Sequence, residues 1–154
     1  MTPLFKKLNL KDQATITVVN APDSFEPELE AIQEIQAISV QSKPSRWSSV
    51  EFAIFFVQTL SQVKAAAKQI AKTKDDPVIW LAYPKGTSKN YTCEFNRDTG
   101  WQAIGDVGFE GVRQVAIDAD WSALRFRRVD HIKTMKRRNS MAISKKGKAR
   151  TKKS

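Results

Sequence analysis

Residues 83–88, Tyr-Pro-Lys-Gly-Thr-Ser, have the side-chain types that hold a small anion. They follow the apolar run 78–82, which predicts a buried strand, so they stand at that strand's carboxyl end. A lysine supplies positive charge, a glycine lets a ligand approach the backbone, and two hydroxyls can donate hydrogen bonds to a carboxylate or phosphate. The alternative is a simple turn in which proline and glycine set the backbone and lysine aids solubility. The expected ligand-binding residues here are Tyr83, Lys85, Gly86, Thr87 and Ser88.

Two residues elsewhere in the chain could join this cleft. Arg97 could make a bidentate contact to the same anion, or it could pair with Asp98 beside it. Asn20 follows the first predicted strand, and ligands of open parallel sheets bind outside the carboxyl ends of the strands. We therefore add Arg97 and Asn20 to the candidate ligand site.

Catalytic chemistry has little support in the sequence. His131 is the only histidine, and a catalytic triad would need it folded back into a cleft from the start of a basic tail. Cys93 is the only cysteine, so it can form neither an internal disulfide nor a cysteine-based metal cluster. We predict no catalytic residue and no metal site, and the sequence favours a protein that is not an enzyme.

The first strand–helix turn, residues 20–22, lacks the Gly-x-Gly-x-x-Gly motif of dinucleotide-binding proteins. The helix predicted after it opens with Glu26, Glu28 and Glu30, which complement the helix dipole. A pyrophosphate at this helix end would meet negative charge where it needs free N–H groups. We therefore predict that the protein binds no dinucleotide and, in the favoured interpretation, no cofactor.

Strands alternate with helices along most of the chain. β-branched and apolar runs predict the strands, and apolar residues spaced three or four apart predict the helices. This alternation is typical of a mainly parallel sheet with right-handed crossovers. We expect a small three-layer Rossmann-like α/β domain with about six strands that ends in an antiparallel hairpin. The predicted strands are residues 14–19, 37–40, 50–58, 78–83, 112–117 and 121–127, and the predicted helices begin near residue 23 and span 61–73 and 96–107.

Positive charge is concentrated at the C-terminus. Residues 132–154 hold ten of the 26 Lys and Arg residues and no acid, whereas residues 1–131 hold 16 basic and 16 acidic residues. We expect one α/β domain over 1–131 and a disordered tail over 132–154, because the tail is almost without apolar side chains. Such a run attracts nucleic-acid phosphates or an acidic protein, although a merely solubilising tail is the alternative. The residues expected to make these contacts are Lys136, Arg137, Arg138, Lys145, Lys146, Lys148, Arg150, Lys152 and Lys153.

Membrane and secreted proteins are excluded by the pattern of apolar residues. The longest strongly apolar run, 52–57, is far shorter than the ~20 residues of a membrane-spanning helix. Lys6 and Lys7 are not followed by an apolar stretch, so no secretory signal is expected. We expect a cytoplasmic protein with no membrane partner.

Several motifs together resemble a family of short bacterial proteins of unknown function. They are the Tyr-Pro-Lys-Gly-Thr-Ser loop, Asn96-Arg97-Asp98 with Trp101, and residues 113–126, in which Asp-x-x-Trp-Ser-Ala-Leu-Arg is the most specific part. The resemblance covers roughly residues 8–128. Members are similar in layout to a shortened methyltransferase-like Rossmann sheet, which also ends in a reversed hairpin. The resemblance therefore implies that fold and no particular activity.

Two functions of different classes fit these features. The favoured one is a non-catalytic binding or accessory protein, whose cleft accepts a small anionic ligand and whose tail contacts nucleic acid or an acidic partner. The alternative is a reduced methyltransferase that uses S-adenosylmethionine (SAM). The missing glycine-rich turn argues against the alternative. A ribose-binding acid is also expected after the second strand, where Gln41, Ser42 and Lys43 stand instead.

Overall fold

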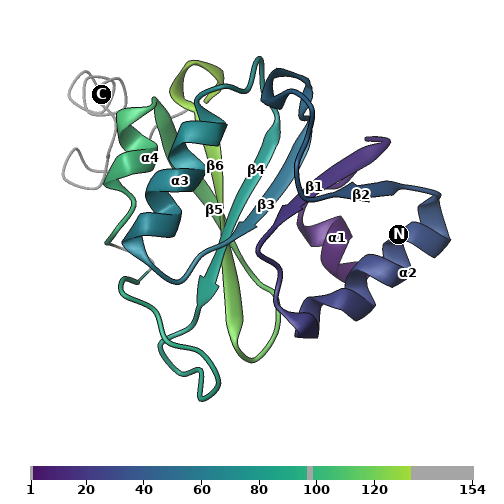
Figure 1. Ribbon diagram of the computed structural model, residues 1–154, viewed down its shortest axis with the longest axis horizontal. Coiled ribbons are helices and arrows are strands. Elements are labelled where there is room, and N and C mark those ends of the chain that lie inside the picture. The colour runs from purple at the N-terminus through teal and green to yellow at the C-terminus, as the bar shows by residue number, and fades with distance from the viewer. Residues whose placement is uncertain (1, 97–98, 133–154) are drawn as a thin grey trace.

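The computed structural model describes residues 2–96 and 99–132 of the chain, and six strands form one sheet within this part (Figure 1). Arg97 and the predicted contact residues of the tail lie outside the described residues. The strand order is β2-β1-β3-β4-β6-β5. The strands are β1 (Thr15–Val19), β2 (Ser39–Gln41), β3 (Phe52–Phe56), β4 (Val78–Pro84), β5 (Phe109–Ala116) and β6 (Trp121–Arg128).

The strand directions confirm the predicted α/β class. Strands β1 to β4 are mutually parallel, and β6 is antiparallel to both of its neighbours, β4 and β5. The closing hairpin therefore folds back into the sheet, so that its second strand lies between β4 and β5. This arrangement leaves β5 at the edge, parallel to β4.

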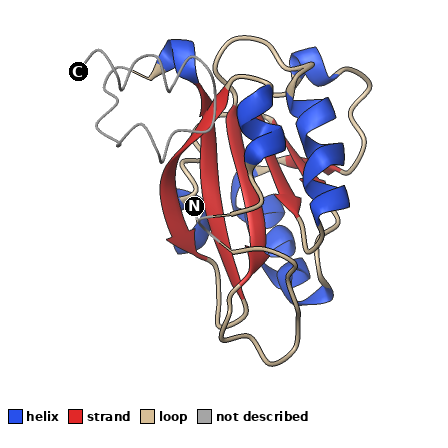
Figure 2. Cartoon of the chain, turned by 90° about the vertical axis from the view of Figure 1, so that its left-hand side faces the viewer, coloured by secondary structure: helices blue, strands red, loops and turns tan. Residues whose placement is uncertain are grey.

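Helices cover both faces of the sheet, which gives the expected three layers (Figure 2). Helices α1 (Pro3–Lys7) and α2 (Glu26–Gln36) pack on one face, and α3 (Leu60–Ile70) and α4 (Gln102–Asp106) pack on the other (Figure 1). Short 3-10 turns lie at Asp23–Phe25, Trp47–Ser49 and Val129–His131. None of the helices in the described residues combines the length and apolarity that a bilayer crossing requires.

Helix α3 shows how the sequence sets one of these elements. Thr59 caps it by accepting a hydrogen bond from the N–H of Gln62, and the Gln62 side chain accepts one from the N–H of Thr59 in return. Val63, Ala67 and Ile70 form the buried face of the helix. The cap and the apolar spacing together fix where α3 begins and which side faces the sheet.

Helix α1 is not predicted by the sequence pattern. Thr2 caps it by accepting a hydrogen bond from the N–H of Phe5 at 3.2 Å, and Phe5 is fully buried against the sheet. The carbonyl oxygen of Leu8 accepts a hydrogen bond from the indole N–H of Trp80 at 2.8 Å. A residue of the central strand β4 therefore helps to hold this five-residue helix, which is too short to be stable alone.

The helix predicted over 96–107 is wrong in its first half. Helix α4 spans only Gln102–Asp106. Gly100 has φ +89°, and a Cβ atom there would lie 2.5 Å from the Cβ of Phe95. The chain therefore makes a sharp turn at Gly100, which an α-helix cannot accommodate. The following strand also differs, because it begins at Phe109 rather than at residue 112.

Candidate functional site

Among the described residues, two cavities open near the carboxyl edge of the parallel strands, which is the lower edge of the sheet in Figure 1. The larger has a volume of about 730 Å³ and lies beside the end of β4. The smaller, of about 410 Å³, lies beside the ends of β1 and β3. Both volumes are in the range of small-molecule sites. Both cavities are on the side of the sheet covered by α3 and α4.

The larger cavity, here called the Lys85 cavity, contains part of the predicted anion site. Tyr83, Lys85 and Gly86 line it together with Gln114 and Ser122 from the hairpin. Lys85 is half-buried, whereas Gly86 is exposed. Gly86 does not have positive φ, and a Cβ atom there would meet nothing within 4 Å. Glycine is therefore not required by the backbone at this position, and a side chain would project into open space.

Polar side chains meet on the wall of the Lys85 cavity that the sheet provides. Gln114 on β5 donates hydrogen bonds from Nε2 to the Tyr83 hydroxyl at 3.1 Å and to the Ser122 hydroxyl at 3.0 Å. Gln114 and Ser122 belong to residues 113–126, which carry the resemblance, but they were not predicted as ligand-binding residues. They were missed because only the strand register brings them beside Tyr83.

The hydroxyl of Ser88 has a structural contact. It donates a hydrogen bond to Asp120 Oδ1 at 2.8 Å, and Asn90 Nδ2 donates one to Asp120 Oδ2 at 3.1 Å. The backbone N–H of Lys85 also donates to the carbonyl of Asp120 at 2.8 Å. Neither Ser88 nor Thr87 is among the described residues that line the cavity. These bonds tie the loop after β4 to the turn between β5 and β6.

Cys93 lines the same cavity and is half-buried. Burial raises the pKa of its thiol, and the nearby Glu94 carboxylate raises it further, although a hydrogen bond from the Phe95 backbone opposes the shift. At neutral pH the side chain is therefore a thiol and a poor nucleophile. In the part of the chain that the structure describes, no group of three or more His, Cys, Asp or Glu residues could hold a metal ion.

The smaller cavity lies at the topological switch point of the sheet. The chain leaves β1 toward β2 and leaves β3 toward β4, in opposite directions along the sheet, so a crevice forms between β1 and β3. Asn20 and Val57 line this switch-point cavity at the ends of the two strands. Asn20 has φ 59°, a left-handed conformation that asparagine tolerates better than most residues. The structure therefore places Asn20 in the switch-point cavity, apart from Lys85.

Two side chains in the switch-point cavity have features that suit a ligand. Trp47 stacks on Phe55, with ring centroids 5.4 Å apart and an interplanar angle of 16°. Gln69 Oε1, from α3, is buried and has no hydrogen-bond partner in the described residues. A buried amide oxygen is costly unless a ligand or water donates to it. Neither residue was predicted from the sequence, although a glutamine on the inner side of a helix is a usable signal.

Glu94 lies between Cys93 and Phe95, which line the Lys85 cavity, and it connects that cavity with the switch-point cavity. Glu94 donates a backbone hydrogen bond to the carbonyl of Gln58 at 3.0 Å, and its carboxylate accepts one from the N–H of Leu60 at 3.2 Å. The N–H of Gln58 in turn donates to the side chain of Gln62, which lines the switch-point cavity. Glu94 and Gln58 thus link the walls of the two cavities.

The fold resembles that of solved methyltransferase structures. A SAM-dependent methyltransferase from Aquifex aeolicus superimposes with a TM-score of 0.59 over 82% of this chain and 88% of that chain, at 13% sequence identity. A protein described as a type 11 methyltransferase from Sulfolobus solfataricus gives a TM-score of 0.53 over 86% and 94%, at 8% identity. No family model and no curated protein matches the sequence. The predicted methyltransferase-like Rossmann layout is therefore confirmed, whereas membership of a family of short bacterial proteins stays a prediction.

This likeness contradicts the prediction that the protein has no cofactor. The chain shares its fold with a protein that is SAM-dependent. The carboxylates of Glu26 and Glu28 in the first turn of α2 oppose phosphate groups, but SAM has no phosphate. Its sulfonium and ammonium groups are cationic, so acidic residues near this edge of the sheet do not oppose it.

The residues of the switch-point cavity fit SAM in most respects. The volume is sufficient, Trp47 offers an aromatic face to an adenine ring, and Gln69 offers an acceptor for a hydroxyl or amine. The chain departs from the expected pattern at the end of β2, where a carboxylate that binds the ribose would be expected. Gln41 stands there, and its amide donates a hydrogen bond to the Thr17 hydroxyl at 3.1 Å.

Proposed function

We propose that this protein is a shortened methyltransferase that binds SAM in the switch-point cavity. The observation that carries the proposal is the unpartnered oxygen of Gln69, buried in a cavity at the switch point of a methyltransferase-type sheet. Ligands of open α/β sheets bind at this position. The Lys85 cavity at the same edge of the sheet would accept the methyl acceptor.

Each residue in this proposal has one task. Trp47 would stack on the adenine, Gln69 would accept a hydrogen bond, and Asn20 would present its amide at the end of β1. When bound, SAM supplies an electrophilic methyl group. Lys85 would hold an acceptor that carries a carboxylate or phosphate. Cys93 would stay protonated, so the proposal includes no covalent intermediate on the protein.

The proposal is tested by isothermal titration calorimetry of the full chain with SAM and with S-adenosylhomocysteine. We expect saturable binding with a Kd in the micromolar range. Ala65→Phe should abolish the binding, because Ala65 is an exposed residue of α3 that lines the cavity, and the larger side chain would fill it without disturbing the core. Gln69→Leu should weaken the binding by about tenfold, which corresponds to one lost hydrogen bond.

Gln114→Leu is the matched control, because it makes the same chemical change in the Lys85 cavity. It should leave SAM affinity unchanged. Absence of heat up to millimolar SAM would overturn the proposal. Equal affinity of the wild type and Ala65→Phe would place SAM elsewhere and would overturn the assignment of the cavity.

A second function is a non-catalytic anion-binding protein, which the Lys85 cavity favours. The half-buried Lys85 lines this cavity next to Gly86, and the space where a side chain of residue 86 would lie is empty. Thermal-shift measurements with acetate and inorganic phosphate would test it. Lys85→Ala should remove any stabilisation, whereas Lys89→Ala, an exposed lysine on the same loop, should retain it.

A further inference from the structure

A positively charged region lies on the opposite side of the sheet from both cavities. Arg125 on β6 stands opposite Trp80 of β4, and Arg113 on β5 stands opposite Arg125. Residues directly opposite in an antiparallel pair project from the same face. Trp80 is buried on the face that α1 covers, so both arginines project on that face.

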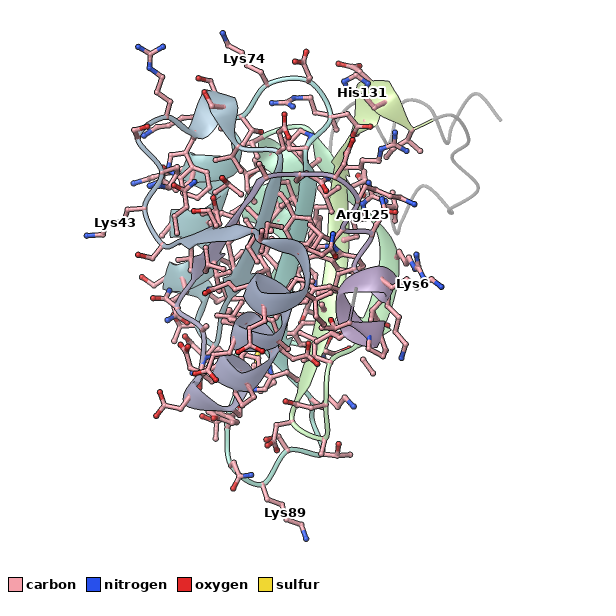
Figure 3. All side chains as sticks on the ribbon, turned by 90° about the vertical axis from the view of Figure 1, so that its right-hand side faces the viewer. Lys6, Lys43, Lys74, Lys89, Arg125 and His131 are labelled. Atoms are coloured by element: carbon pink, nitrogen blue, oxygen red, sulfur yellow. The ribbon has the colours of Figure 1, made fainter. Side chains whose placement is uncertain are left out.

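Three further basic residues belong to the same region. Arg127 follows Arg125 by two positions along β6 and therefore shares its face. Lys6 and Lys7 form the exposed last turn of α1, whose end contacts Trp80 through Leu8. Figure 3 shows Lys6 and Arg125 on the same side of the molecule. The five residues, here called the arginine face, are Lys6, Lys7, Arg113, Arg125 and Arg127.

The arginines of β6 differ in what they contact. Arg127 makes a bidentate ion pair with Asp76, with Nε 2.9 Å from Oδ1 and Nη2 2.5 Å from Oδ2. Arg128 donates hydrogen bonds to the backbone carbonyls of Thr73 and Asp75. Both residues therefore hold the turn before β4 in place.

Arg125 and Arg113 have no such task. Neither has a hydrogen-bond or ion-pair partner among the described residues, and the Nε atom of Arg125 is buried without one. Burial lowers the pKa of Arg125, and the guanidiniums of Arg127 and Arg113 lower it further, although Asp76 acts in the other direction. Within the described part of the chain, Arg125 is half-buried without a hydrogen-bond partner, and the Asp76 carboxylate that attracts it is already paired with Arg127, so its burial costs stability. Such a cost is expected where an anion from outside completes the site.

We propose that the arginine face binds the phosphate backbone of a nucleic acid. Arginine side chains match phosphate geometry with two parallel hydrogen bonds. Arg125 and Arg127 repeat along β6 at about 7 Å, so the cations form a row that a linear polyanion can follow, with the Arg127 guanidinium already paired with Asp76. All five residues are Lys or Arg, and contacts of such side chains to phosphates carry no sequence information, so we expect binding that does not depend on sequence.

The chain beyond the described residues favours the same partner. Strand β6 ends at Arg128, and the basic stretch 132–154 begins a few positions later in the sequence. This stretch carries ten cations and no acid. This tail has the same sign of charge as the arginine face. A nucleic acid can contact both, whereas a protein interface is usually built around an apolar centre, which the five cations do not supply.

The test is the binding of fluorescein-labelled random-sequence DNA, as 20-base duplex and single strand, to the full chain over a series of KCl concentrations. The variant is Arg113→Gln/Arg125→Gln. Loss of two phosphate contacts should reduce the slope of log K against log salt by about 1.8 for the duplex and should weaken binding roughly 10- to 60-fold at 0.1 M salt. Its Tm should not fall, because Arg113 is exposed and Arg125 is a half-buried charge without a hydrogen-bond partner in the described residues.

The matched control is Lys64→Gln/Lys68→Gln, which removes two exposed charges from α3 on the other side of the sheet. It should keep the wild-type slope and nearly the wild-type affinity. Duplex and single strand should also raise the Tm of the wild type more than that of the arginine variant.

Two results would overturn the proposal. Equal affinity and slope for the wild type and the arginine variant would assign all binding to the tail. No binding of either DNA at 0.1 M KCl, together with binding of polyglutamate that is lost in the arginine variant, would assign the face to an acidic protein. SAM binding is measured separately and does not depend on these residues, so either proposal can fail alone.

Discussion

The hydroxyl of Ser88 donates a hydrogen bond of 2.8 Å to the carboxylate of Asp120, 32 residues further along the chain. The other oxygen of Asp120 accepts from Asn90, and its backbone carbonyl accepts from Lys85. The loop that begins with Lys85 is therefore held against the turn of the hairpin. The shape of the Lys85 cavity depends on this connection.

Asp120→Ala should lower the free energy of unfolding by about 1–2 kcal/mol, because it removes a charged acceptor from two partly exposed hydrogen bonds. Urea unfolding measures the change. Asp106→Ala is the control, since Asp106 is exposed and accepts from Gln102 on the same short helix. An Asp120→Ala protein as stable as the control would show that the loop is held by other contacts.

Trp80→Ala should cost about 3–5 kcal/mol, because Trp80 is completely buried in the central strand. Trp80→Phe should cost less, but it should still destabilise, since the carbonyl of Leu8 loses its indole donor. Trp47→Phe is the matched control on a half-buried tryptophan. Thermal and urea unfolding give the order, and nearly unchanged stability of Trp80→Ala would contradict the core position.

Gly100→Ala and Gly86→Ala form a matched pair. Gly100 has φ +89° and its missing Cβ would meet the Phe95 Cβ at 2.5 Å, so alanine should destabilise by more than about 1 kcal/mol. Gly86→Ala should leave stability unchanged within about 0.5 kcal/mol, because the new methyl group meets nothing within 4 Å. Comparable Tm values for the two variants would contradict the backbone conformation at Gly100.

The ion pair between Asp76 and Arg127 predicts a dependence of stability on pH. The hydrogen bond from Arg127 holds the pKa of Asp76 below its usual value of 3.8, although burial opposes the shift. The ionised Asp76 carboxylate therefore stabilises the fold fully above about pH 4. This contribution disappears as the pH falls through the lowered pKa of Asp76.

Asp76→Asn should accordingly lower stability by about 1 kcal/mol at neutral pH, and the difference from the wild type should shrink below about pH 4. Urea unfolding at a series of pH values tests this. A difference that persists unchanged at about pH 3 would mean that Asp76 acts by packing rather than by charge.

The sequence predicted well the elements whose cause is local. The β-branched run of β1 and the apolar runs of β3 and β4 were placed correctly, because buried parallel strands are apolar on both faces. Helix α1 was not predicted, because it depends on Trp80 from a distant strand. The start of α4 was predicted wrongly, because the helix begins only after the turn at Gly100.

The candidate site was predictable only in part. Tyr83, Lys85 and Gly86 follow one strand, so a single segment places them together. Gln114 and Ser122 join them through the register of the hairpin, and Asn20 is separated from them because β3 lies between β1 and β4. Pairing between strands depends on contacts far apart in the chain, which local patterns do not contain.

The amino-acid sequence alone determined the α/β class, the closing hairpin and the concentration of positive charge at the C-terminus. It could do so because periodicity, turn residues and charge are properties of neighbouring residues. Only the tertiary structure decided that Gln69 Oε1 is buried in a crevice with no hydrogen-bond partner among the described residues, and that Arg113 and Arg125 share a face. Both depend on which strands and helices pack together, because burial and electrostatic environment arise only when distant segments meet.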